Sequence, residues 1–221
     1  QTVGNVLEVV LAAYLLRRAA RSGYLLGRLD GLVRLLPPLA IATMVSATVG
    51  TLASRAGGVI EWSAFLTVWR TWWLGDACGA LVVVPLALAW WRPVTRLSRA
   101  RYAEFVLMLA VTGTLTGIAF SAPKALEYLA FPGLIWAALR FGQRGATLAL
   151  ALVTGVAIWN TTNSSGPFHF HSITNSILST QLFIAVATVS ALCVAAIVSE
   201  RARFAAGLAE SRTALLRAAD S

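Results

Sequence analysis

The stretch WRTWWLGDACGALVVVPLALAWW, residues 69–91, decides the fold of this chain. It is apolar almost throughout and is longer than the ~20 residues that a bilayer-spanning helix needs. Lipid offers the backbone no hydrogen-bond partners, so only helices and closed barrels span a membrane, and the sequence shows no alternating strand pattern. The stretch therefore predicts a transmembrane helix, inside which Arg70 and Asp76 are costly charges.

The composition extends this prediction to the whole chain. Of 221 residues, 58% are hydrophobic and 12% are charged, with a mean hydropathy of +0.74, whereas soluble domains carry about 25% charged residues. The net charge of +9 does not indicate nucleic-acid binding, because the arginines lie in short loops between apolar runs. Cys78 and Cys193 lie inside apolar runs and predict neither a disulfide framework nor a zinc site. We expect an all-α, polytopic transmembrane helix bundle with the lipid bilayer as a partner.

The hydropathy pattern predicts about seven membrane segments, at residues 3–16, 32–54, 64–91, 103–121, 125–141, 145–159 and 175–199. The first segment is short for a bilayer span. The chain also begins with Gln1 rather than Met and ends at Ser221 within a helical pattern. We therefore expect a piece of a longer protein, with one or more segments missing before Gln1.

The basic residues predict the orientation of the bundle. Fifteen of the 18 fall in the loops after the first, third and fifth segments and in the C-terminal tail, and the other three are Arg55, Arg70 and Lys124. Short cytoplasmic loops carry the excess of basic residues. The C-terminus is thus expected in the cytoplasm and Gln1 outside, in a multi-pass membrane protein.

The composition changes at Glu200, which divides the chain into a membrane domain, residues 1–199, and a helical linker, residues 200–221. Apolar residues at Phe204, Leu208, Leu215 and Leu216 alternate with charges, as in an amphipathic helix. Such a helix, continuous with the last membrane segment, could pass a shift or a rotation to a downstream domain. A solvated tail is the alternative interpretation.

Asp76 lies about 18 Å into its helix at 1.5 Å per residue, near the middle of the bilayer. An ionised aspartate there costs roughly 2.5–3.5 kcal/mol, so it is expected to face the bundle interior. Trp69, Trp72 and Trp73 share its helix face, whereas Arg70 points elsewhere and is a poor partner. A polar contact that fixes the packing, a ligand or ion site, and a proton relay all remain open.

Other features of these segments have structural and functional interpretations. Gly75 and Gly79 form a small-xxx-small pair that lets another helix approach, and Pro85 is expected to kink its helix. The tryptophans fit interfacial belts better than an aromatic cage for a cation. His169 and His171 could form a metal pair or a pH sensor, but a plain loop is expected. The sequence contains no catalytic motif, so we expect no enzyme activity, cofactor or metal in this chain.

Three stretches occur in a fixed order, WWLGDACGALVVVPLALAW, FPGLIWAALRFGQRGA and SGPF, preceded by GNVLEVVLAAYLLRR and followed by a Glu-Arg pair after the last segment. Together they resemble the first type of bacterial membrane-associated sensor domain, the MASE family, over about residues 4–203. The matching positions are Trp73, Gly75, Asp76, Gly79, Pro85, Pro132, Trp136, Arg140, Gly142 and Gly145.

The resemblance implies a sensory module placed before cytoplasmic outputs such as histidine kinases, GGDEF diguanylate cyclases or EAL phosphodiesterases, often with PAS domains between. It supplies no ligand. The candidate sensing or helix-packing residues are Trp69, Arg70, Trp72, Trp73, Gly75, Asp76, Gly79, Pro85, Trp136 and Arg140.

We therefore expect an input module that acts on a cytoplasmic signalling domain in the same chain, in response to an unknown ligand and with a possible homodimer. The alternative is a small membrane transporter or channel, for which the prolines that interrupt several segments would be a sign.

Overall fold

The computed structural model of the chain describes residues 2–20, 26–91, 98–122, 126–163, 165–168, 170 and 172–219. Its elements are α1 (Thr2–Ala20), α2 (Leu29–Ala56), α3 (Trp62–Trp90), α4 (Arg99–Ser121), the 3₁₀ helix η1 (Glu127–Leu129), α5 (Ala130–Thr162) and α6 (Ile173–Ala219). These residues include no strand, which confirms the predicted all-α fold. His169 and His171 lie outside the described residues.

Five helices in the described part of the chain are long and apolar enough to cross a membrane, so the predicted count of about seven segments is not confirmed. They are α2, α3, α4, the η1–α5 unit and α6. α1 is 19 residues long but carries Glu8, Arg17 and Arg18. The segments predicted at 125–141 and 145–159 both fall, in their described residues, within the η1–α5 unit and the residue before it.

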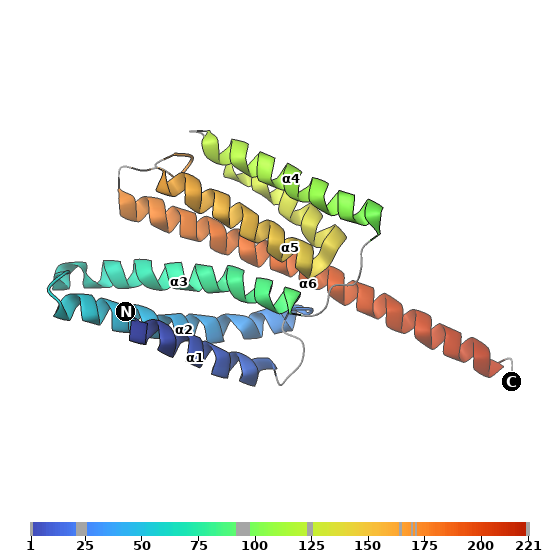
Figure 1. The fold of residues 1–221 in the computed structure, drawn as a ribbon. Helices are drawn as coiled ribbons and strands as arrows, with labels where there is room; N and C mark the ends of the chain where they lie inside the picture. The colour runs from blue at the N-terminus through green and yellow to red at the C-terminus, as the bar shows by residue number, and fades with distance from the viewer. Residues whose placement is uncertain are drawn as a thin grey trace.

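α5 reverses its direction at Gly142, where φ is 60° and ψ is −144°. The arm before this glycine, residues 130–141, runs beside α4, and the arm after it, residues 143–162, returns beside α6 (Figure 1). Hydrogen bonds at the two ends agree with this course. Gln143 donates to the carbonyl of Leu26 at one end of the bundle, and the hydroxyls of Thr161 and Thr180 lie 3.0 Å apart at the other.

Two groups of three helices form the bundle, α1–α3 and α4–α6, and they meet where α3 contacts α5 and α6 (Figure 1). Small buried residues occur along α6 at helical spacing, at Ala187, Ala191 and Ala195. They pack in the same core clusters as Ala146 and Ala149 of α5. Small side chains let helix backbones approach closely in a membrane, so α5 and α6 form the centre of the second group.

The prolines expected to interrupt the segments do not break these helices. α2 remains helical through Pro37 and Pro38, and α3 remains helical through Pro85. Pro132 lies in the first turn of α5, where the missing N–H has no helical acceptor in any case. The marked discontinuity is at Gly142 instead.

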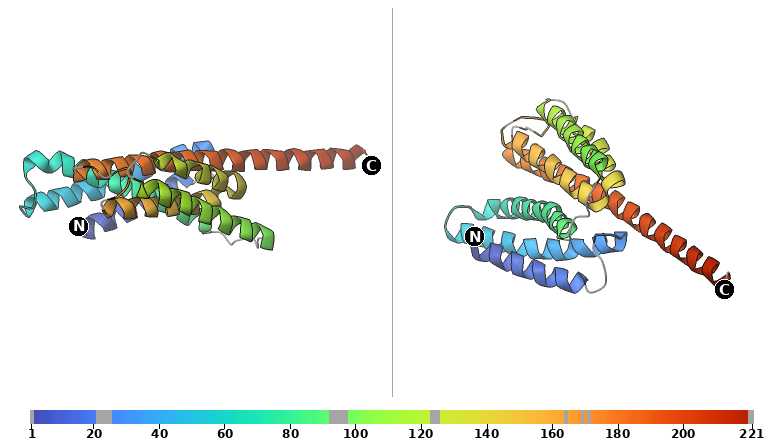
Figure 2. Two further views of the ribbon diagram at one scale, coloured as in Figure 1. Left: turned by 90° about the horizontal axis from the view of Figure 1, so that it is seen from above. Right: turned by 45° about the vertical axis from the view of Figure 1, so that its right-hand side comes forward.

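α6 is 47 residues long and leaves the bundle without a break. Its last buried side chain is that of Ala196, whereas all the side chains of residues 201–213 are exposed. The helix projects beyond the other helices in every view (Figure 2). At 1.5 Å per residue, the part from residue 201 to Ala219 is about 28 Å long.

Candidate functional site

Two tryptophans of α3 attach this helix to α2 by hydrogen bonds. Trp69 donates from Nε1 to the hydroxyl of Thr48 at 3.0 Å, and Trp73 donates from Nε1 to the carbonyl of Ala40 at 3.1 Å. Their rings stack with centroids 5.5 Å apart. Because both indole N–H groups have acceptors on α2, these rings position α3 as well as cover apolar surface.

A third tryptophan, Trp72, packs against a glycine of α2. A Cβ atom added to Gly50 would lie only 2.5 Å from the ring of Trp72. A residue larger than glycine at this position would therefore push the ring away. The three tryptophans predicted to share one face of the helix do so, and that face contacts α2.

Asp76 lies on the same face, one turn further along α3, and is half-buried. Its carboxyl interacts with the hydroxyl of Ser46 on α2 and with the indole of Trp72. Oγ of Ser46 lies 3.2 Å from Oδ1 of Asn5 on α1, and the carboxyl of Glu8 on α1 lies near Ser46 and Asp76. Asp76 thus belongs to a polar cluster that joins the first three helices.

These contacts lower the free-energy cost of placing Asp76 inside the membrane segment, because a polar side chain in a membrane is tolerated where it has polar partners within the protein. The sequence predicted that Asp76 would need partners from other segments but did not identify them. The contacts with Ser46 and Trp72 give Asp76 partners in the packing of α2 and α3. A role of Asp76 in sensing stays a prediction.

Gly75 and Gly79 line a cavity of about 230 Å³ between α3, α5 and α6. A Cβ on Gly75 would lie 3.1 Å from Nε2 of Gln181 on α6, so this glycine does permit a close approach. A Cβ on Gly79 would meet nothing within 4 Å. Gly79 therefore lines open space, and the expected helix contact is found only at Gly75.

The remaining candidate residues are distributed over other parts of the bundle. Trp136 packs against the main core cluster, and Pro85 is buried within α3. Arg140 pairs through Nε with the carboxylate of Glu104, which connects the first arm of α5 to α4. Arg70 is exposed. The ten candidate residues therefore do not form one site.

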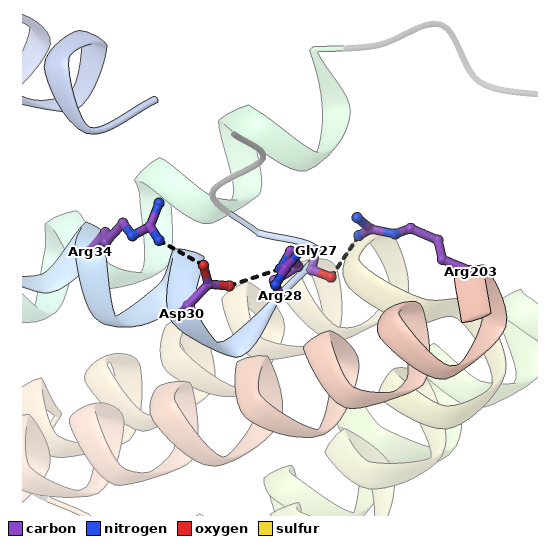
Figure 3. Close-up of polar contacts among 5 residues, drawn as sticks. All are labelled: Gly27, Arg28, Asp30, Arg34 and Arg203. Carbon is purple, nitrogen blue, oxygen red and sulfur yellow. Dashed lines mark hydrogen bonds and ion pairs between the residues drawn. The ribbon is translucent and has the colours of Figure 1, made fainter. Parts of the chain in front are cut away.

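A second set of contacts lies where α6 leaves the bundle. Arg203 of α6 donates from Nη2 to the carbonyl of Gly27 at 2.6 Å, just before α2 begins (Figure 3). In the same region Arg28 and Arg34 both pair with Asp30. Nearby, Arg144 of α5 donates to the carbonyl of Ala89 in α3 at 3.1 Å. We call this region the arginine-rich end of the bundle.

Sequence reasoning missed four residues that make these contacts, Ser46, Gly50, Gln181 and Arg203. Gln181 had a usable signal, since it is the one amide side chain between residues 176 and 199, inside a long apolar run. Ser46 and Gly50 had none, because serine and glycine are common in membrane helices. The described residues contain no cluster of three or more His, Cys, Asp or Glu side chains that could bind a metal.

The fold and these contacts define a multi-pass helical membrane protein whose last helix continues beyond the bundle. A family profile for MASE1 matches residues 1–202, so the chain belongs to the MASE1 family of membrane-associated sensor domains. This is a family of sensory input domains and not of catalytic ones. Comparison with curated proteins and with solved structures found no match.

Proposed function

We propose that this chain is the sensory input module of a bacterial signalling protein and passes a stimulus through α6 to a cytoplasmic output. The observation that carries the proposal is the continuity of α6, which runs from the cavity and the core to an exposed extension within one helix. A continuous helix transmits a shift or rotation along its axis with little loss, because every turn is hydrogen-bonded to the next.

The contacts at the arginine-rich end support a route for the signal. Arg203 lies on α6 just beyond the bundle, and its acceptor, Gly27, belongs to the connection that leads into α2. A movement of the α1–α3 group relative to α4–α6 would change this contact. The sensor then needs two arrangements of the groups, and a stimulus that favours one of them shifts their populations.

The distribution of basic residues supports an inner-membrane location with the C-terminus in the cytoplasm. The start of α2, the end of α3, the start of α4 and the turn at Gly142 all lie at the end of the bundle from which α6 projects (Figure 1). Arginines cluster in these connections, and such clusters stay on the cytoplasmic side.

The exposed part of α6 supports a homodimer as part of the proposal. Phe204 is 67% exposed and Leu208 is 73% exposed, four residues apart on the same face of the helix. Apolar residues at such spacing form the seam of a parallel coiled coil when two copies associate. The downstream domain that we propose is a histidine kinase or a diguanylate cyclase in the same chain.

The test changes the helical phase of α6. With a diguanylate cyclase domain fused after Ser221, an insertion of four residues after Arg203 turns the output by about 40° and an insertion of two turns it by about 200°. We expect the first insertion to retain most of the cyclase activity set by the membrane domain and the second to change it severalfold. Equal activity from both insertions would refute transmission through a rigid α6.

A pair of arginine variants tests the route itself. Arg203→Ala removes the contact with Gly27 and is expected to shift cyclase activity, whereas Arg212→Ala alters an exposed arginine of the same helix and should not. A small transporter or channel, the alternative function, predicts that neither the phase of α6 nor Arg203 affects an attached output domain.

A further inference from the structure

The cavity beside Gly79 is lined by two buried side-chain oxygens, from Thr154 and Gln181, that have no hydrogen-bond partner among the described residues. It lies between α3, the second arm of α5 and α6. A larger groove, of about 370 Å³, lies between α3 and α6, and the two spaces share Ile177 and Gln181 in their walls. The groove includes Thr174 near the start of α6, and this start lies at the end of the bundle opposite the arginine-rich end (Figure 1).

We infer that this cavity binds an uncharged small molecule that has an apolar body and one hydrogen-bond donor. The described lining residues of the cavity are glycine, isoleucine, threonine, cysteine and glutamine, and none of them carries a charge. A charged ligand would lose its hydration there without gaining a counter-ion. Apolar walls with a few polar groups are typical of small-molecule sites.

The side-chain carbonyl oxygen of Gln181 is the group of the lining that requires a donor. Oε1 of Gln181 and Oγ1 of Thr154 are both buried and have no hydrogen-bond partner among the described residues. An unsatisfied buried acceptor destabilises the protein, and native structures contain few of them. Since a carbonyl oxygen only accepts, a ligand that satisfies Gln181 has to donate.

The size of the cavity limits the ligand to about one substituted ring. A dry cavity of about 150 Å³ in another protein holds benzene, and this cavity of about 230 Å³ has room for additional heavy atoms. The glycine at position 79 maintains the space, because a Cβ there would enter it without meeting another atom within 4 Å.

The position of Gln181 connects the cavity with the contact between the two groups of helices. Its side-chain Nε2 donates to the backbone carbonyl of Thr71 at 3.0 Å, and its backbone carbonyl accepts from Sγ of Cys78 at 3.3 Å. Both bonds join α6 to α3. A ligand that donates to Gln181 would therefore bind at the junction of α3 with α6. Any effect of the ligand on signalling rests on the function proposed above, whereas the binding of the ligand does not.

Binding can be measured on the 221-residue chain in lipid nanodiscs by fluorine NMR. The probes are para-fluorophenol, which has a donor, and para-fluoroanisole, in which a methyl group replaces the donated hydrogen. Empty nanodiscs correct for partition into lipid. We expect saturable binding of the phenol, about two- to tenfold tighter than that of the anisole, as for one added hydrogen bond.

Three variants test the location. Gly79→Leu fills the cavity and should abolish saturable binding, while Gly117→Leu in α4, where a Cβ also meets nothing within 4 Å, should retain it. Gln181→Met removes the acceptor and should make the two probes bind equally. This last variant keeps the inference testable if Gly79→Leu fails to fold.

Several results would overturn the inference. They are the absence of saturable phenol binding to the wild-type chain, unchanged binding in Gly79→Leu, and a preference for the phenol that survives in Gln181→Met. Binding that occurs in detergent but disappears in nanodiscs would mean that a lipid chain occupies the cavity. None of these results depends on an output domain, so the ligand-binding inference and the proposed transmission through α6 are tested independently.

Discussion

The contact between Trp72 and Gly50 gives the sharpest prediction about how α2 and α3 are held together. In Gly50→Ala the new Cβ would lie 2.5, 2.7 and 3.0 Å from three atoms of the six-membered ring of Trp72. Contacts this short force the ring or the helices to move, which typically costs 1–3 kcal/mol, about the cost of an overpacked core. Alanine also favours the helix over glycine by up to ~1 kcal/mol, which offsets part of this cost.

A matched control separates the two contributions. Gly117→Ala in α4 places a Cβ where nothing lies within 4 Å, so only the gain in helix propensity remains. We expect Gly50→Ala to have a free energy of unfolding about 1–3 kcal/mol lower than that of Gly117→Ala. Equilibrium unfolding of both variants, in mixed micelles with increasing denaturing detergent, measures this difference.

A second substitution tests whether the indole causes the effect. Trp72→Phe removes the part of the ring that a Cβ on Gly50 would meet, so it should relieve the cost of Gly50→Ala in the double variant. The double-mutant cycle should give a coupling energy of about 1 kcal/mol or more. The reasoning is refuted if Gly50→Ala is as stable as Gly117→Ala, or if the two substitutions at the contact are additive.

Three further predictions concern the acid, the turn in α5 and the orientation. Asp76→Asn keeps the polar contacts with α2 and should accumulate in membranes like the wild type, whereas Asp76→Leu removes these contacts and should lower the amount of folded protein. Equal membrane abundance of the two variants would show that the polar cluster does not hold the helices together. Gly142→Ala forces a positive φ on a residue with a Cβ and should lower the free energy of unfolding by about 1–3 kcal/mol, while Gly155→Ala, with nothing within 4 Å, should not. An impermeant thiol reagent should label Asn163→Cys in intact cells but Ser98→Cys only after permeabilisation, and the reverse pattern would invert the proposed orientation.

The helical membrane fold could be predicted from the sequence because a bilayer permits few backbone structures. Long apolar runs in lipid have to be helical, and the basic loops predict which ends lie together. The face of α3 that carries Trp69, Trp72 and Asp76 also followed from helical spacing, and the structure places these residues against α2.

Only the tertiary structure decided what each face of α3 contacts. A pair of glycines four residues apart is the same sequence pattern whether a helix or an open space lies beside it. In the structure Gln181 lies close to Gly75, whereas Gly79 lies beside a cavity. Proline removes a hydrogen bond inside a helix, yet α3 stays helical through Pro85, whereas α5 turns back at Gly142. Partners of Asp76 and Gln181 come from other helices, and helical periodicity gives the direction of a side chain but not the identity of the residue that it meets. The all-α class of fold and the face of α3 that carries the tryptophans therefore follow from the sequence, whereas the number of helices that could cross the membrane and the pairing of their faces depend on how the described helices pack together.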